Sequence, residues 1–271
     1  MTADIYHLAS LKEFLEKNEL QAKRSLGQNF LFHKRELQKI IESADIQPND
    51  HVLEIGSGLG HLTSMMEEAG AKITAYEIDQ RLTSLWPDLH PKSKANIINQ
   101  DFLQAQKEEY KNCTKVVANL PYYIVKEIIL KLISSKIKFQ SLTFTIQKEE
   151  ALRLSQKPRE PRYGALNAML QILGPTECLS TIKKDNFYPR PHIDSAILHI
   201  GPITWPDPPI WAVTQQLIKT AFSQRRKQLQ TSLKVLNIPP EAFSQANISP
   251  ASRPEQIDPH SFISLAKLSL K

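Results

Sequence analysis

The sequence predicts an α/β fold in which a mainly parallel sheet carries helices on both faces, followed by a small helical domain. Three observations support this prediction. Short apolar strands alternate with helical patterns from about residue 52 to residue 173, as in parallel sheets. Beyond residue 203 the pattern is helical to the end. The chain has 271 residues, of which 41% are hydrophobic, enough for one large core and a smaller one.

The elements of the α/β part follow from hydrophobic periodicity and turn residues. Before the sheet we expect an amphipathic helix over 3–20, an irregular segment over 23–31 and a helix over 33–44. Strands are expected at 52–55, 72–78, 97–98, 116–120 and 142–146, with helices at 61–69, 81–86 and 125–134. Helices at 148–155 and 167–173 follow, and two antiparallel strands near 177–182 and 193–200 close the domain.

A proline-rich stretch indicates the domain boundary. Residues 201–209 contain four prolines, a composition that is typical of the end of a domain or the start of a linker. We therefore expect one domain over residues 1–203 and a helical C-terminal domain over residues 204–271. Helices are predicted in the second domain at 210–222, 226–236 and 259–270.

Composition limits the possible classes of protein. The net charge of +6 and the pI of about 9.1 permit a polyanionic partner without requiring one. The two cysteines, Cys113 and Cys178, are far apart and have no histidine or cysteine at metal-ligand spacing, so we expect neither a disulfide framework nor a metal site. The charged segment 1–20 has no apolar signal core, and no apolar run reaches membrane-spanning length. We therefore expect a cytoplasmic protein without a membrane segment.

Three consecutive strand ends carry residues that suit a nucleoside ligand. The loop Glu54–Gly60 has the pattern ExGxGxG, whose glycine spacing differs from the GxGxxG of dinucleotide-binding proteins. Glu77 ends the second strand, where a carboxylate can accept both ribose hydroxyls. Asp101 ends the third strand and can accept from the amine of an adenine, with Phe102 closing over the ring. Together these residues favour S-adenosylmethionine and argue against an NAD-dependent oxidoreductase.

The tetrapeptide Asn119-Leu120-Pro121-Tyr122 follows a buried strand, at the edge of the sheet where α/β proteins bind ligands. The amide oxygen of Asn119 can accept a hydrogen from an exocyclic amine, and the ring of Tyr122 can stack on a base. On its own, the tetrapeptide fits an ordinary proline turn equally well. Next to a candidate S-adenosylmethionine site, it indicates methyl transfer to the amine of a base.

The motifs of the whole chain are similar to those of one family. The shared motifs are Ser25–Leu31, Glu54–Gly60, Glu77–Asp79, Asp101-Phe102, Asn119–Tyr122, Gln147–Glu149, Tyr163-Gly164, Phe187–Ala196, Phe222–Lys227 and Arg253–Glu255. With them the chain resembles the bacterial ribosomal small-subunit RNA adenine dimethyltransferases, the KsgA or RsmA family, from about Lys23 to Ile257. Tyr123, Ala165 and Arg190–His192 depart from the family pattern, and these departures concern the fit to RNA rather than the chemistry.

The resemblance implies a Rossmann-like class I methyltransferase domain, here residues 1–203, with a helical C-terminal domain. It implies S-adenosylmethionine as the methyl donor and N6-dimethylation of two adjacent adenines near the 3′ end of small-subunit (16S) rRNA. The implied partner is the assembling 30S subunit, and we expect the protein itself to be a monomer.

The resemblance also implies roles for individual residues, carried over by position. Around the donor, Gln28, Asn29 and Leu31 would line the methionine end, Gly56 would lie behind the donor, Glu77 would hold the ribose, and Asp101 the adenine. Asn119, Leu120 and Tyr122 would form the methyl-transfer site, with Asn119 also beside the donor and Phe187 on the other face of the target adenine. Lys23, Arg24, Arg225, Arg226 and Lys227 would contact RNA phosphates.

Two alternatives remain open from the sequence. Macrolide-resistance methyltransferases share this core and modify large-subunit rRNA, although Tyr122 and the stretch Phe187–Pro189 favour the small-subunit group. A non-catalytic RNA-binding assembly factor could keep the same fold, but the complete donor motifs and Asn119 argue against it.

Overall fold

The computed structural model describes residues 5–270, which form two compact units. The α/β unit comprises Met1–Ala151 and Cys178–His199, and the helical unit comprises Leu152–Glu177 and Ile200–Lys271. The assignment of residues 152–177 to the helical unit was not foreseen. Compactness does not show that a part folds alone, so the division into domains at residue 203 stays a prediction.

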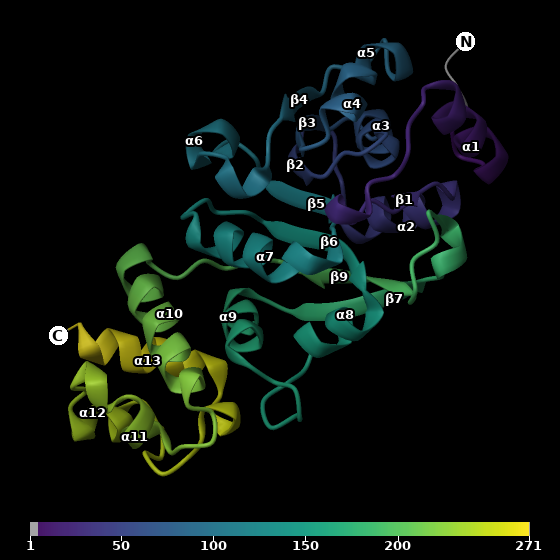
Figure 1. Cartoon of the computed structure of the whole chain (residues 1–271). Helices are drawn as coiled ribbons and strands as arrows, with labels where there is room; N and C mark the ends of the chain where they lie inside the picture. The colour runs from purple at the N-terminus through teal and green to yellow at the C-terminus, as the bar shows by residue number, and fades with distance from the viewer. Residues whose placement is uncertain (1–4, 271) are drawn as a thin grey trace. The chain divides into compact units, whose positions relative to one another are not determined.

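A seven-stranded sheet organises the α/β unit, with strand order β4-β3-β2-β5-β6-β9-β7 (Figure 1). Its strands are β2 (His51–Ile55), β3 (Lys72–Glu77), β4 (Asn96–Asn99), β5 (Lys115–Asn119), β6 (Ser141–Gln147), β7 (Thr176–Ile182) and β9 (Ser195–Ile200). The pairs β3–β4, β2–β3, β2–β5 and β5–β6 are all parallel. The predicted α/β fold with a mainly parallel sheet is therefore confirmed.

Helices connect these strands and supply the apolar side chains that cover them. The helices are α1 (Leu8–Lys17), α2 (Lys34–Ser43), α3 (His61–Glu68), α4 (Gln80–Ser84), α5 (Trp86–Leu89), α6 (Lys107–Tyr110), α7 (Val125–Ser134) and α8 (Lys148–Leu154). Leu37 and Ile40 of α2 pack with Met66 of α3 and with Val52 and Ile73 of the sheet, all nearly inaccessible to solvent. Burial of such side chains contributes roughly 1.5–3 kcal/mol each, so this layer fixes α3 and the loop before it.

Two predicted helices differ from the structure. The helix expected over 3–20 begins at Leu8 and ends at Lys17, and residues 3 and 4 lie outside the described residues. The helix expected over 81–86 is instead the pair α4 and α5, because Pro87 occupies the first turn of α5, where a proline starts a helix but cannot continue one.

A second, two-stranded sheet joins distant parts of the α/β unit. Strand β1 (Phe30–Leu31) pairs antiparallel with β8 (Phe187–Tyr188), Phe30 opposite Tyr188 and Leu31 opposite Phe187. A strand of two residues is too short to show the alternation of apolar and polar residues by which strands are recognised. The prediction that segment 23–31 is irregular throughout was therefore wrong. The segment also contains a short 3₁₀ turn, Arg24–Leu26.

The helical unit contains α9 (Ala165–Leu173), α10 (Pro208–Ser223), α11 (Leu229–Ser232), α12 (Pro240–Gln245) and α13 (Pro259–Ser269). The helix predicted over 226–236 is wrong, because its middle is held by another part of the chain. The backbone N–H groups of Leu229 and Gln230 donate to carbonyl oxygens of Ser252 and Pro250, which restricts the helix to a single turn. None of the helices in residues 5–270 is long and apolar enough to cross a membrane.

Candidate active site

A cavity of about 320 Å³ lies at the carboxyl ends of the parallel strands in the α/β unit. Its wall includes residues directly after β2, β3, β4 and β5, four neighbours in the sheet. Strands β2, β3 and β4 follow one another toward one side of the sheet, and β5 then lies on the opposite side of β2. The direction in which strands are added therefore reverses between β2 and β5. Open α/β sheets bind their ligands at such a point.

The glycine loop after β2 forms the floor of this cavity. Gly56 and Gly60 have φ values of +77° and +81°, in the left-handed region that side chains disfavour. A Cβ atom on Gly60 would lie 2.5 Å from Nε2 of His90 and 2.6 Å from the Trp86 ring. A Cβ atom on Gly56 would meet its nearest neighbour, the carbonyl oxygen of Asn119, at 3.9 Å. Gly60 therefore permits close packing, while Gly56 faces the end of β5 without being crowded by it.

Glu77, at the end of β3, is buried at the cavity wall and held in a fixed position. One carboxylate oxygen accepts from the backbone N–H of Gly58 and the other from that of Asp79, each at 2.8 Å. Burial raises the pKa of Glu77, and these hydrogen bonds oppose the rise. A carboxylate oxygen has more than one lone pair, so each can also accept from a ligand hydroxyl. This geometry fits the ribose role predicted for Glu77, which stays a prediction.

Glu54 is a buried acid in the cavity wall to which the sequence assigned no separate role. It is 1% exposed, and one carboxyl oxygen accepts from the hydroxyl of Thr63 at 2.5 Å. Its Oε1 has no hydrogen-bond partner among the described residues. Burial raises the pKa of Glu54 to about 8, so the carboxyl is neutral at neutral pH in this structure. Its place directly before the glycine loop was the sequence pattern that could have revealed it.

Asp101 and Phe102 follow β4 and also line the cavity. One oxygen of Asp101 accepts from the backbone N–H of Leu103 at 2.9 Å and caps a 3₁₀ turn. Phe102 is 4% exposed and meets the ring of Tyr76 edge-on, with centroids 5.3 Å apart. The capped turn fixes the direction of the carboxylate, and its predicted contact with an adenine stays a prediction.

Asn119, the last residue of β5, has an amide group with a defined orientation. Its Nδ2 donates to the backbone carbonyl of Asn29 at 3.1 Å. With Nδ2 engaged in this way, Oδ1 is the atom available to accept from a substrate amine. The next residue, Leu120, is 2% exposed and donates its N–H to the carbonyl of Thr145 at 3.0 Å. The start of the Asn-Leu-Pro-Tyr segment is thus held on both sides.

Tyr122 lines the cavity, and its ring is fixed by a partner that the sequence did not reveal. The Tyr122 hydroxyl and the Oγ of Ser195 are 2.9 Å apart. Ser195 begins β9 and is fully buried. Burial raises the pKa of Tyr122, so the phenol stays neutral. Ser195 was noticed as part of a motif, but nothing in the sequence indicated its contact with Tyr122.

The predicted donor and transfer residues thus come together, with one exception. The predicted residues that line the cavity are Gln28, Asn29, Leu31, Gly56, Glu77, Asp101, Asn119, Leu120 and Tyr122. Phe187 is not among the described lining residues. It is 2% exposed and packs in the core beside Leu31 and Leu37, so its predicted stacking on a base would need this core to open. That role stays a prediction.

The basic residues predicted to contact RNA lie in both units. In the α/β unit, Lys23 and Arg24 are exposed, and Lys23 Nζ also pairs with Asp79 Oδ1 at 3.4 Å. In the helical unit, Nη2 of Arg225 donates to the carbonyl of Pro161 at 2.9 Å, whereas Arg226 and Lys227 are exposed in the turn after α10. Arg226 and Lys227 are therefore better placed than Arg225 to meet a phosphate.

Comparisons with known proteins find relatives over most of the chain. Residues 19–270 match the family model for ribosomal RNA adenine dimethylase. Ribosomal RNA small subunit methyltransferase A of Lactobacillus johnsonii is 37% identical, with 92% of this chain and 91% of that protein covered. The protein of the same name from Bacillus licheniformis is 35% identical, with 95% and 91% covered.

Two solved structures share the fold at lower identity. A dimethyladenosine transferase from Plasmodium falciparum has a TM-score of 0.71 at 24% identity, covering 85% of this chain and 94% of that chain. The 23S rRNA methyltransferase ErmE has a TM-score of 0.66 at 24% identity, covering 89% and 100%. These structures support the class I methyltransferase fold.

The buried carboxyl of Glu54 makes stability depend on pH. Its folded-state pKa of about 8 lies above the ordinary value of 4.5, so its favourable contribution is complete below about pH 4.5 and is lost as the pH rises to about 8. Glu54→Gln imitates the neutral carboxyl. Relative to this variant, the wild type should lose up to about 1.4 kcal/mol of unfolding free energy per pH unit between pH 5 and 8.

Urea unfolding of both proteins over this pH range checks the prediction. Glu16→Gln, which changes an exposed carboxyl on α1, is the control and should keep the wild-type slope. Parallel stability curves for wild type and Glu54→Gln would show that Glu54 is ionised in the folded protein throughout.

Proposed function

Since the chain belongs to the ribosomal RNA adenine dimethylase family, we propose that it methylates small-subunit rRNA. It transfers methyl groups from S-adenosylmethionine to N6 of two adjacent adenines near the 3′ end of that RNA. The observation that carries the proposal is the single cavity that unites the glycine loop, Glu77 and Asp101 with Asn119 and Tyr122.

The residues of the cavity fit S-adenosylmethionine. Gly56 faces the end of β5 without being crowded by it, and Glu77 presents two fixed oxygens for the ribose hydroxyls. Asp101 follows the next strand of the sheet, β4, and lines the same cavity, where it can accept from an adenine amine. When bound, the donor supplies a sulfonium methyl group that is already activated.

The residues around Asn119 orient the adenine amine. The N6 lone pair is delocalised into the ring, so the amine is a poor nucleophile until its hydrogens are held out of the ring plane. The Oδ1 of Asn119 and the backbone carbonyl of Leu120 accept these hydrogens and direct the lone pair at the methyl group. Orientation of this kind can lower a barrier by on the order of 7–11 kcal/mol, so no strong base is needed.

Tyr122 provides the surface on which the target base stacks. Its ring is held at the hydroxyl by Ser195, so it can receive a base that has left its own stack without losing much conformational freedom. Stacking contributes roughly 1–3 kcal/mol per base. The ring face also stabilises the positive charge that grows on N6 as the methyl group arrives.

RNA binding is proposed for the exposed cations of both units. Lys23, Arg24, Arg226 and Lys227 would neutralise phosphates, with Arg225 in support. Such contacts supply affinity and register rather than sequence discrimination. The RNA would be part of an assembling 30S subunit in the cytoplasm. The protein would bind it as a monomer.

Methylation of the large subunit is the competing function. ErmE, a 23S rRNA methyltransferase, shares the fold, but fold similarity at this identity does not identify the RNA. Several relatives that cover most of the chain are named as small-subunit enzymes, which favours the small subunit. A non-catalytic assembly factor would have no need of the oriented amide at Asn119.

Methyl transfer to isolated subunits tests the proposal. Labelled S-adenosylmethionine is offered with small subunits from a strain that lacks the modification, and with large subunits in parallel. Label in two adjacent adenines of small-subunit RNA is expected. Label confined to the large subunit would show that large-subunit rRNA, and not small-subunit rRNA, is the substrate. Donor binding without label on either subunit would indicate a non-catalytic assembly factor.

Asn119→Ala should retain donor binding and lose methyl transfer by about two orders of magnitude or more, comparable to the loss of one oriented hydrogen-bonding group in other active sites. The measurements are binding of S-adenosylhomocysteine by calorimetry and single-turnover transfer to small subunits. Thr143→Ser, a small change on the neighbouring strand β6, is the control. Transfer at near the wild-type rate in Asn119→Ala would contradict the proposed role of the amide.

Ser195→Ala should slow methyl transfer about tenfold while donor binding stays unchanged, because the Tyr122 ring loses its anchor and one hydrogen bond. Tyr122→Phe removes the same hydrogen bond from its other end, so the double variant should be no slower than either single variant. Additive losses in single-turnover rates would show that the two groups act independently.

Replacing both Arg226 and Lys227 with alanine should weaken binding to small subunits and reduce the salt dependence of that binding, because fewer counterions are released. The binding constant measured over a series of salt concentrations gives this slope. Donor affinity should be unaffected, and Lys219→Ala on α10 is the matched control. An unchanged slope in the double variant would exclude phosphate contacts at this turn.

A further inference from the structure

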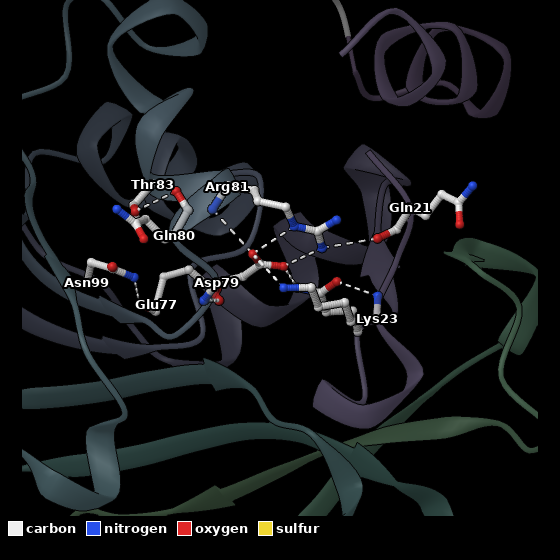
Figure 2. A network of polar contacts seen from close by, with 9 residues as sticks. Gln21, Lys23, Glu77, Asp79, Gln80, Arg81, Thr83 and Asn99 are labelled. Carbon is white, nitrogen blue, oxygen red and sulfur yellow. Dashed lines mark hydrogen bonds and ion pairs between the residues drawn. The ribbon is translucent and has the colours of Figure 1, made fainter. Parts of the chain in front are cut away.

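A network of polar contacts surrounds Asp79, just outside the cavity (Figure 2). Asp79 is 2% exposed, although it is a carboxylate in the loop between β3 and α4. Its Oδ2 accepts from Arg81 Nη2 at 2.6 Å and from Gln28 Nε2 at 2.9 Å. Its Oδ1 accepts from Arg81 Nε at 3.0 Å and from Lys23 Nζ at 3.4 Å. The hydrogen bonds from Arg81 hold the pKa of Asp79 well below its usual range.

Two partners of Asp79, Lys23 and Gln28, belong to the N-terminal lining segment, which we define as residues 21–31. Both ends of the Gln28 side chain are engaged, since Nε2 donates to Asp79 and Oε1 accepts from the backbone N–H of Lys23 at 2.7 Å. Arg81 Nη2 also donates to the backbone carbonyl of Gln21 at 3.1 Å. The turn after β3 is therefore bonded to the segment at three positions.

The other end of the N-terminal lining segment contacts the methyl-transfer residues. A Cβ atom on Gly27 would lie 3.1 Å from Pro121 and 3.2 Å from the Tyr123 ring, so the segment packs closely there. The carbonyl of Asn29 accepts from Asn119. Residues 26–31 line the cavity, so the segment connects the donor side of the cavity with the Asn-Leu-Pro-Tyr side.

We propose that Asp79 is a positioning residue that anchors the N-terminal lining segment against the cavity through Gln28, and thereby sets donor affinity. The proposal rests on the proposed function, since it takes S-adenosylmethionine to be the ligand of the cavity. Asp79 is not among the described lining residues and acts through Gln28 and Lys23. Gln28, placed at the donor by the family resemblance, serves here as the connection, because its amide is bonded to the protein at both ends.

A simpler role for Asp79 would be to cap helix α4. Its Oδ1 accepts from the backbone N–H of Arg81 at 3.2 Å, which is an N-cap contact. An asparagine caps a helix about as well as an aspartate. Asp79→Asn therefore keeps the cap, but an amide has one acceptor oxygen. If that oxygen takes the Oδ1 position, it keeps the cap and the bond from Arg81 Nε. The introduced amide nitrogen then faces Gln28 Nε2 and Arg81 Nη2, so both of these hydrogen bonds are lost.

The reverse change gives a compensating partner. Gln28→Glu by itself places a second carboxylate against Asp79, which is unfavourable. In the double variant the introduced amide at position 79 can donate to the introduced carboxylate at position 28, and that carboxylate still accepts from the N–H of Lys23. The hydrogen bond between positions 79 and 28 is restored with donor and acceptor exchanged, whereas the bond from Arg81 Nη2 to position 79 is not. If Asp79 acted only as a cap or through general stability, the second change would not restore donor affinity.

The test is the dissociation constant of S-adenosylhomocysteine for the full-length protein and the three variants, measured by calorimetry. Each single variant should bind about tenfold more weakly, as expected for the loss of one hydrogen bond to a charged group. The double variant should return to within about threefold of wild type.

In methyl transfer by the single variants, the Michaelis constant for the donor should rise more than the turnover number falls. Amide hydrogen exchange in residues 21–31 should quicken in Asp79→Asn and slow again in the double variant.

Asp50→Asn is the matched control. Asp50 precedes β2, at the end of the sheet away from the cavity, and is 14% exposed. It pairs with Lys115 at 2.9 Å and accepts from the N–H of Gln47 at 2.7 Å. This variant loses a comparable buried ion pair, so donor affinity should stay within about twofold of wild type even if the melting temperature falls.

The outcomes separate this inference from the proposed function. Wild-type affinity in Asp79→Asn, or additive losses in the double variant, would overturn the anchoring role while the donor site stands. A wild-type protein that binds neither S-adenosylmethionine nor S-adenosylhomocysteine would overturn both.

Discussion

The parallel register of four neighbouring strands is the constraint on which the rest of the site depends. In strands β4, β3, β2 and β5 the backbone hydrogen bonds align the carboxyl ends at one edge. Glu77 is opposite Asn99 in this register, and Ile55 is opposite Tyr76. The glycine loop, the two acids and Asn119 converge because the sheet orders them, although they span more than sixty residues of chain. A shift of one residue in any of these strands would turn its terminal side chain to the other face.

Three acidic residues lie close together at this edge, and each is accommodated by a different physical means. Glu54 is neutral because burial outweighs the hydrogen bond from Thr63. Glu77 receives two backbone N–H groups, which partly offset its burial. Asp79 is ionised because Arg81 bonds to it directly. Burial keeps Glu54 neutral and Arg81 keeps the charge on Asp79 compensated, which limits repulsion among the three acids.

The fold and most of the cavity could be predicted from the sequence because they follow from local patterns. The alternation of strands and helices gives the sheet, and the residues that follow the strands, such as Glu77 and Asn119, become its ligand-binding edge. The contacts that fix those residues could not be predicted, because they join positions far apart in the chain. The pairs Tyr122–Ser195 and Gln28–Asp79 are of this kind. Phe187 illustrates the same limit, since its motif fitted both stacking on a base and packing in the core, and only the structure shows it in the core beside Leu31. The error at 226–236 arose because a loop from 249–252 bonds to its backbone.

The small sheet formed by β1 and β8 has a consequence for the synthesis of the protein. Phe30 and Leu31 leave the ribosome early, whereas their partners Tyr188 and Phe187 emerge after most of the α/β unit has been made. Domains form as the chain is produced from its N-terminus, and contacts that close a long loop form late. The wall of the cavity at residues 30 and 31 therefore lacks its support in any shorter nascent chain. The cavity wall would in this way be complete only when translation of the chain is well advanced.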